Sequence, residues 1–233
     1  MDIAYISPLL QPVTLNARAV LQEQNERVEH VNFIETGIVS LRALAAGSML
    51  ETAMVGCHGA VGVSVALCGE MSMHRAIVLV PGRALRIRTD DLLQSMRERP
   101  QIREHFLRYV QSLIIHSSQM ALCGVRHELE PRLACWLCLV CDALDGDIVP
   151  ITHNYISMIL GLHRAGITRA LARFDQQGLV RKTRGLLQVR DRTLLRRKAC
   201  GCYGAIASGY DWTKLRESKP PGLGRDPMFC SES

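Results

Sequence analysis

Arg164, Thr168 and Arg169 lie close together in a segment, from about His163 to Gln176, that could do chemistry at a nucleic-acid surface. The apolar residues of this segment recur at spacings of four and three, as Ile167, Leu171 and Phe174. This spacing predicts a helix with one buried face, and it leaves the three polar side chains on the other faces. A guanidinium group on the outside of a helix can donate two hydrogen bonds to the guanine edge in the major groove of DNA.

A second helix is predicted just before this one, from Thr152 to Leu160, with Thr152 as its N-terminal cap. Gly161 separates the two helices and permits the left-handed backbone of a tight turn. After Gly178, two short apolar runs flank the basic turn at 181–185, which predicts a hairpin. Two helices joined by a tight turn and followed by a hairpin are typical of a winged helix-turn-helix, whose second helix enters the major groove.

The distribution of charge favours the same interpretation. Residues 146–198 contain eleven Lys and Arg and three Asp, a net charge of +8, whereas the whole chain carries +6. Positive charge is therefore concentrated where a polyanion would bind, and double-stranded DNA is the predicted partner. The alternative is a helical hairpin whose basic face is simply solvated.

The composition of the 233-residue chain is that of a globular protein, with 48% hydrophobic and 21% charged residues. No apolar run approaches the roughly 20 residues of a membrane helix, and the N-terminus lacks a secretory signal pattern, so we expect a cytoplasmic protein with no membrane partner. The nine Cys residues are odd in number and irregularly spaced, which favours reduced thiols over a disulfide framework.

Upstream of this motif, the residue pattern of the chain changes twice. From Val28 to about Ile87, short Val- and Ile-rich segments alternate with Gly, and Pro81-Gly82 is a strong turn signal, so we expect a small antiparallel sandwich or roll. After Pro100 a long helix is predicted. One of its faces has heptad-like spacing and is suited to a partner helix; it comprises Ile102, Phe106, Tyr109, Leu113, His116, Met120 and Cys123.

The face beside this seam carries Val110, Ile114 and Ala121, which could pack against the roll. The alternative is one amphipathic core helix in a monomer. Further helices are predicted at 128–144 and within 200–216, and residues 217–233 are predicted to be a disordered tail.

This order of elements resembles the Crp/Fnr family of bacterial transcription regulators, over about residues 8–198. The most specific part of the resemblance is ITHNYISMILGLHRAGITRALARFDQQGLV, and HVNFIETGIVSL resembles a strand region of the family's roll. The resemblance implies an α+β fold and a homodimer that grips a roughly palindromic site. The expected domains are a cyclic-nucleotide-binding-like β-roll at 1–98, a dimerisation helix at 99–126, a winged helix-turn-helix at 127–198, and a C-terminal helix and tail at 199–233.

At positions that match the family's recognition helix, Arg164 and Arg169 resemble base-reading arginines, with Thr168 and Ala165 beside them. Ala165 stands where the best-known members carry an acidic residue that can accept from cytosine, so the family's consensus half-site is not expected here. The predicted DNA-backbone contacts, which position the protein without reading sequence, are Thr152, His153, Asn154, His163, Arg181, Lys182 and Arg184.

The resemblance also locates a degenerate ligand pocket in the roll. Cyclic-nucleotide-binding relatives carry a Gly-Glu pair and an Arg-Ser or Arg-Thr pair, whereas this chain has Gly62-Val63 and Arg75-Ala76. Ser117 and Ser118 match positions that contact the purine. Because the ribose hydroxyl loses its carboxylate partner, which costs about 1–3 kcal/mol, no tight cyclic-nucleotide binding is expected.

No cofactor or metal is expected from the sequence. Residues 1–56 contain no Cys, so the N-terminal cysteine cluster of iron–sulfur relatives is missing. Cys135, Cys138 and Cys141 share one broad helix face, with Cys123 or His127 as an additional ligand, but three thiols on one helix are a poor chelating geometry and are interpreted as buried core residues. Cys200 and Cys202 are interpreted as incidental, and haem ligation is not expected at the scattered residues His74, His105 and His116.

The sequence therefore predicts a dimeric DNA-binding transcription regulator, with RNA polymerase as a candidate partner. The alternative is a protein-interaction scaffold that uses the roll and the long helix and leaves Arg164 and Arg169 idle. No enzymatic activity is expected, because the sequence shows no nucleophile–base pair, phosphate loop or carboxylate couple.

Overall fold

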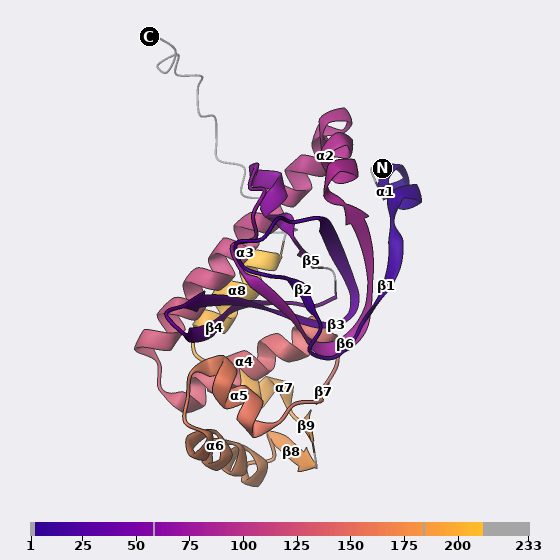
Figure 1. Cartoon of the computed structure of the whole chain (residues 1–233). Helices are drawn as coiled ribbons and strands as arrows, with labels where there is room; N and C mark the ends of the chain where they lie inside the picture. Colours follow the sequence, from indigo (N-terminus) through magenta and orange to yellow (C-terminus); the bar gives the residue numbers. More distant parts are fainter. Residues whose placement is uncertain (1–2, 58, 184, 212–233) are drawn as a thin grey trace, which may run out of the picture.

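The computed structural model describes residues 3–57, 59–183 and 185–211; the predicted tail at 217–233 and Arg184 lie outside the described residues. An antiparallel roll occupies one end, a long helix runs along it, and a compact helical unit with a small sheet forms the other end (Figure 1). The predicted α+β class, with an N-terminal roll, a long helix and a C-terminal winged helix-turn-helix, is confirmed. Among the described helices, none has the length and hydropathy needed to cross a membrane.

The roll is a six-stranded antiparallel sheet in which β1, β6, β3 and β4 are successive neighbours, while β2 pairs with β6 and β5 pairs with β3. It follows two short N-terminal helical turns, α1 (Ile3–Ile6) and η1 (Ser7–Leu9), and a third, η2, lies between β5 and β6. The bounds are β1 Gln11–Leu15, β2 Val20–Gln22, β3 His30–Ala45, β4 Ser48–Val55, β5 Ala60–Val61, η2 Val63–Leu67 and β6 Arg75–Arg88.

Two strands of the roll are much longer than the predicted short segments. β3 has 16 residues and β6 has 14, and β6 runs through Pro81-Gly82, so the turn predicted there is wrong. Ile38 pairs with Val80 and Thr36 with Arg83, which places two residues opposite Gly37 and makes a β-bulge. A Cβ on Gly82 would lie 2.0 Å from the Thr36 carbonyl oxygen, so glycine permits the close approach. Proline is tolerated at such an irregularity, and the pair bends the strand without reversing it.

The long helix α3 (Pro100–Arg126) follows a shorter helix, α2 (Thr89–Glu98). The prediction that the heptad-like face of α3 meets a partner helix is wrong, because this face packs into the chain's own core. Its buried members are Ile102, Phe106, Tyr109, His116 and Cys123. The adjoining face is split, since Val110 packs on the roll as predicted but Ile114 is 59% exposed and Ala121 is also exposed. The roll and the C-terminal helix of the same chain cover the face that the heptad-like spacing assigned to a partner helix.

The helix α4 (Leu129–Leu144) lies at the centre of the molecule, and its residues from Leu133 to Cys141 are buried. Cys135, Cys138 and Cys141 are among them, in the core position that the sequence suggested. After the DNA-binding motif come α7 (Arg192–Lys198), which the sequence analysis missed, and α8 (Cys202–Tyr210), which lies within the predicted 200–216. Helix α8 returns to α3, where Ser112 Oγ donates to the Gly209 carbonyl at 2.6 Å.

The two helices of the winged helix-turn-helix match their prediction to within a residue. Thr152 caps α5 (His153–Leu160) by accepting a hydrogen bond from the Tyr155 amide at 3.3 Å, and Gly161 follows with φ +61°. After α6 (Arg164–Gln176), the predicted hairpin is present and consists of β8 (Val180–Thr183) and β9 (Leu186–Val189). The turn predicted at 181–185 is too long, because residues 181–183 pair with β9 as part of β8. A short strand, β7 (Ile148–Val149), which was not predicted, pairs with β9 and ties the hairpin to the segment before α5.

A buried polar network joins the roll to the DNA-binding unit. The Glu51 carboxylate, on β4, accepts a hydrogen bond from Trp136 Nε1 of α4 at 2.7 Å and another from Ser40 on β3. Arg42 Nε donates to Ser40 at 3.0 Å, and the same guanidinium bonds the Tyr155 hydroxyl of α5 and stacks on its ring. Burial raises the pKa of Glu51, while the hydrogen bonds and the nearby Arg42 charge oppose that rise.

We expect Glu51→Gln to be nearly neutral for stability at pH 7, and Glu51→Ala to lower the free energy of unfolding by about 1–3 kcal/mol. The glutamine keeps an acceptor for Trp136 Nε1, whereas alanine leaves that buried donor without a partner. Because the pKa of Glu51 is raised, the folded state binds its proton more tightly, and wild-type stability falls as pH rises from the unfolded pKa through the folded one. Urea unfolding between pH 4 and pH 8 measures both effects.

The Glu51→Gln chain should lack this contribution to the pH dependence. Equal losses for the Gln and Ala variants at pH 7 would contradict the role assigned to the acceptor.

Candidate functional site

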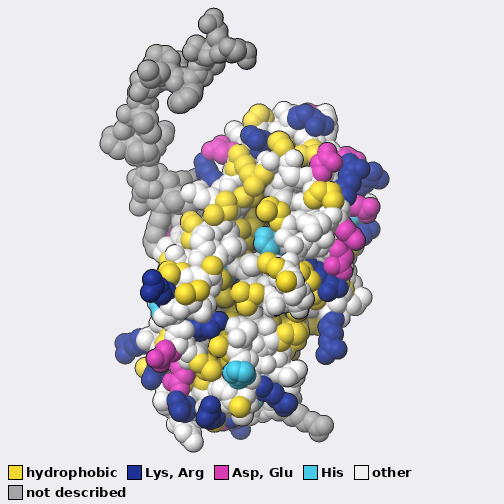
Figure 2. Space-filling model, turned by 60° about the vertical axis from the view of Figure 1, so that its left-hand side comes forward, with side chains coloured by type: hydrophobic (Ala, Val, Ile, Leu, Met, Phe, Trp, Pro, Cys, Tyr) yellow, Lys and Arg dark blue, Asp and Glu magenta, His cyan; other side chains and the backbone are white. Residues whose placement is uncertain are grey.

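Helix α6 presents its predicted base-reading residues to solvent. Arg164, Ala165, Thr168 and Arg169 are all exposed, whereas the apolar face made by Ile167, Leu171 and Phe174 is completely buried. Lys and Arg side chains gather toward the end of the molecule that holds the helix-turn-helix (Figure 2). The helix thus has the free polar face that insertion into a major groove requires.

Gly166, in the first turn of α6, is explained by packing. A Cβ built on it would lie 2.6 Å from the Leu129 Cδ1 atom, at the start of α4. Glycine costs about 1 kcal/mol of helix propensity relative to alanine, but here it lets α6 lie close against the central helix.

A polar hollow of about 210 Å³ opens between the helix-turn-helix and the hairpin. It brings together four predicted DNA-contacting residues, Thr152, His153, Asn154 and Arg164. His153 Nδ1 lies 3.2 Å from the Thr168 hydroxyl, and the pKa of His153 is lowered by burial and by the charges of Lys182 and Arg164. A concave surface with positive potential and hydroxyl and amide groups is suited to phosphate oxygens.

The other predicted backbone contacts are less uniform. Arg181 is exposed on the hairpin, His163 is exposed as the residue before α6, and Arg184 lies outside the described residues. Lys182 Nζ lies 3.9 Å from the Asp175 carboxylate. Some of the +8 charge is offset by acids outside residues 146–198, since Arg173 pairs with Glu130 and Arg196 with Asp142. The DNA-facing charge is therefore smaller than the sequence count.

A second hollow, of about 360 Å³, lies between the roll and α3 at the predicted ligand pocket. Gly62, Val63, Ser117 and Ser118 line it, with apolar neighbours from both elements. Arg75 and Ala76 do not line it; Arg75 Nε lies 2.9 Å from a Glu23 carboxylate oxygen, and Ala76 is buried in the sheet. The structure thus brings four of the six predicted pocket residues together and pairs the arginine with an internal acid.

The three histidines considered for haem lie apart. His74 lines the roll hollow, whereas His105 is exposed, with its Nδ1 2.7 Å from the Gln101 carbonyl. His116 is buried, its Nδ1 lies 3.0 Å from the Tyr210 hydroxyl, and burial lowers its pKa to about 4. These residues do not form a common ligand set.

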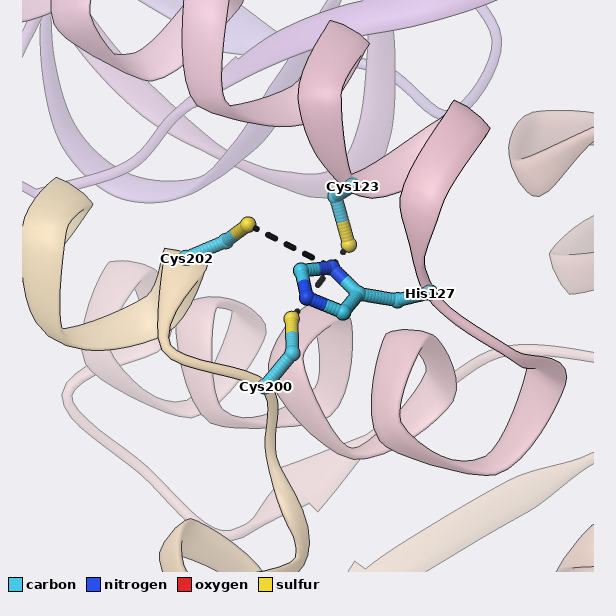
Figure 3. Close-up of side chains that lie close together, drawn as sticks. All are labelled: Cys123, His127, Cys200 and Cys202. Atoms are coloured by element: carbon cyan, nitrogen blue, oxygen red, sulfur yellow. Dashed lines mark hydrogen bonds between the residues drawn. The ribbon is translucent and has the colours of Figure 1, made fainter.

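One cluster of metal-ligating residues was missed by the sequence analysis. Cys123, His127, Cys200 and Cys202 place their ligand atoms within 4.8 Å of one another (Figure 3). Cys200 and Cys202 were interpreted as incidental, and Cys123 and His127 were considered only as partners of the α4 thiols. The available signal was a Cys-x₃-His pair together with a Cys-x-Cys pair, but more than 70 residues separate them. Only the return of α8 to α3 reveals their proximity.

Comparison with known proteins supports the assignment of the C-terminal unit. Residues 131–198 match the family model of the Crp-like helix-turn-helix domain. The chain is 24% identical over 162 residues to the global nitrogen regulator of Nostoc sp., covering 65% of this chain and 73% of that protein. It is 23% identical over 195 residues to the global nitrogen regulator of Synechocystis sp., covering 78% of this chain and 87% of that protein.

Solved structures share the fold over about four fifths of the chain. FixK2 from Bradyrhizobium japonicum has a TM-score of 0.70 at 17% identity, covering 82% of this chain and 98% of that chain. TTHA1359, a CRP/FNR-family transcriptional regulator from Thermus thermophilus, has a TM-score of 0.61 at 18% identity, covering 81% of this chain and 98% of that chain.

Proposed function

We propose that the chain is a DNA-binding transcription regulator of the Crp/Fnr family and that it acts as a homodimer on a roughly palindromic DNA site, one α6 helix in each half-site. The observation that carries this proposal is the exposed polar face of α6, with Arg164 and Arg169, beside the hollow that gathers Thr152, His153 and Asn154. RNA polymerase is the candidate partner at the promoter.

The dimer contact is assigned to a new face of α3, which we call the α3 stripe: Ile114, Ser118, Ala121, Leu122 and Val125. The spacing from Ile114 through Ser118 and Ala121 to Val125 is four, three and four, the repeat of a helix seam. Val125 is 84% exposed and Leu122 is 46% exposed in the single chain. The middle of the face in Figure 2, which brings the α3 side of the molecule forward, is mostly uncharged with many hydrophobic side chains. Such a surface is suited to a second copy of the same helix.

Base reading is assigned to Arg164, Thr168 and Arg169, and positioning on the phosphates to the residues around the polar hollow. Ala165 offers no carboxylate to a cytosine amino group, so the preferred half-site differs at one position from that of relatives with an acid there. The hairpin, with Arg181 and Lys182, flanks the same face and supplies sequence-independent attraction.

The roll is proposed to bind cyclic nucleotide weakly at most. Val63 replaces the carboxylate that would accept from the ribose hydroxyl, and Arg75 does not line the hollow but pairs with Glu23. The lining that remains is largely apolar, from residues such as Leu41, Leu113 and Ile114. A charged cyclic phosphate in this hollow would lose hydration without gaining a matched partner.

We expect Arg169→Ala to cost about 1–3 kcal/mol of binding free energy and to relax the preference at one base position. Lys182→Ala should weaken binding to all sequences and reduce the slope of log affinity against log salt by about one. Footprinting on the DNA upstream of the chain's own gene should show two protected half-sites about one helical turn apart. The matched control is Arg83→Ala, which removes an exposed cation from the roll. Wild-type binding by both variants would refute the recognition-helix assignment and favour the scaffold alternative.

Substitution of the α3 stripe tests the dimer separately. Ile114→Glu and Val125→Glu place charges in the proposed seam, and sedimentation should show a shift from dimer to monomer with a large loss of affinity for a two-half-site DNA. Leu194→Glu is the control, because Leu194 is an exposed apolar residue on α7. A dimer that survives both α3 substitutions would place the interface elsewhere.

For the roll, calorimetry with cyclic AMP on the full chain should show affinity at least about 5- to 150-fold below that of a complete pocket. This range corresponds to the 1–3 kcal/mol lost with the carboxylate partner. Micromolar affinity would contradict the proposal, and footprints with and without the nucleotide should be the same.

A further inference from the structure

Four ligating side chains converge where α3 ends and α8 begins. Cys123 lies in the last turn of α3, and His127 directly follows that helix. Cys200 lies in the loop before α8, and Cys202 is the first residue of α8 (Figure 3). In the close-up all four side chains point into one space, with the imidazole between the thiols. Cys123 and Cys202 are buried, whereas His127 and Cys200 are partly exposed.

The distances among these atoms resemble those around a single tetrahedral ion. Zn–S bonds of about 2.3 Å and Zn–N bonds of about 2.0–2.1 Å place two sulfurs about 3.8 Å apart, and a sulfur and a nitrogen about 3.6 Å apart. Cys123 Sγ lies 3.4 Å from Cys200 Sγ, and Cys202 Sγ lies 3.6 Å from His127 Nδ1. No pair in the set exceeds 4.8 Å, so small side-chain rotations suffice to close the shell.

The donor set selects the class of metal. Three thiolates and one imidazole are soft and borderline ligands, which Ca²⁺ and Mg²⁺ do not take, whereas Cys₃His is a recognised structural zinc set. An iron–sulfur cluster would spread its ligands over several irons, and this set is compact enough for one ion. A disulfide between Cys123 and Cys200 is not formed, since their 3.4 Å separation is far longer than an S–S bond of about 2.05 Å.

The surroundings hold the ligands in place before any ion binds. The Cys200 amide donates to the Pro131 carbonyl at 3.3 Å, which fixes the loop to the first turn of α4. The His127 amide donates to the Cys123 carbonyl at 3.2 Å and thus extends the α3 hydrogen-bond pattern to the second ligand. Outer contacts of this kind orient ligands in metal sites.

We propose that Cys123, His127, Cys200 and Cys202 bind one Zn²⁺ ion, which clamps α8 to the point where α3 passes into α4. Binding converts the three thiols to thiolates and releases their protons to solvent, while His127 ligates as neutral imidazole. The site is independent of the DNA-binding face and of the roll hollow, since it shares no residue with either. It joins the helix that carries the α3 stripe to the C-terminal end of the described chain.

The first test is the metal content of the full chain, purified without a polyhistidine tag under reducing conditions. Elemental analysis should give one zinc per chain, and protein stripped with a chelator should bind Co²⁺ with the intense visible bands of a tetrahedral thiolate site. Less than about one tenth of a zinc after reconstitution with the metal alone, or octahedral cobalt bands, would overturn the proposal. Labile sulfide with iron would also overturn it.

Variants separate ligation from simple destabilisation. Cys200→Ser and Cys202→Ser should each lower zinc affinity by more than about 100-fold, beyond the effect of an outer contact. Cys138→Ser and Cys141→Ser are matched controls, because they alter buried thiols of α4 outside the set and should keep one zinc. His127→Cys should retain zinc and strengthen the sulfur-to-cobalt charge-transfer band, whereas His127→Ala should lose zinc. Equal zinc content in the ligand variants and the controls would refute the assignment.

Hydrogen exchange tests the clamp itself. Removal of zinc from the wild type should raise amide exchange in α8 and in the last turn of α3, with little change in the roll strands. Unchanged protection of α8 after complete removal would show that the ion, if bound, does not hold this helix, and would overturn that part of the proposal.

Discussion

The burial of α4 is the constraint on which the rest of the structure depends. This helix is enclosed by the roll on one side and by α5, α6, α7 and α8 on the others, and Trp136 is completely buried in it. An indole N–H in such a place needs an acceptor, and Glu51 of the roll supplies it at 2.7 Å. This contact between the roll and α4 includes hydrogen bonds to a buried carboxylate as well as apolar packing, and hydrogen bonds constrain the relative orientation of the two parts. It therefore fixes the orientation of the helix-turn-helix unit relative to the roll.

This arrangement decides which face of α3 is free. The roll and α8 cover the side with Phe106, Tyr109 and His116, and only the side with Ile114 and Val125 remains exposed. The heptad-like spacing was present on both sides, so the sequence could predict a long amphipathic helix but not which stripe meets a partner. The choice depends on long-range packing, and burial of Tyr109 and Tyr210 against each other shows that α8 takes part in it.

Local signals explain why the two helices of the helix-turn-helix were predictable to within a residue. Thr152, Gly161 and Gly178 act through their own backbone and side-chain geometry, so capping and turn rules locate them without tertiary information. Pro81-Gly82 shows the limit of the same rules, because its conformation is set by the partner strand across the Gly37 bulge. The polar hollow at the DNA face was also only partly predictable, since the pairing of Lys182 with Asp175 and the position of the hairpin depend on the folded chain.

The cysteine–histidine cluster could not be predicted from the sequence for the same reason, because it depends on long-range packing. Its two halves are short and individually ordinary, and they meet because α8 crosses back over the end of α3. Trp136 of α4 contacts Glu51 of the roll, whereas Pro131, in the first turn of the same helix, accepts a hydrogen bond from the Cys200 loop of the cluster. Each contact joins this half of α4 to a different part of the chain. Both contacts hold α4, which directly follows α3, against other parts of the chain. The position of the helix-turn-helix relative to the roll therefore depends on contacts made by α4 as well as on packing within the helix-turn-helix itself.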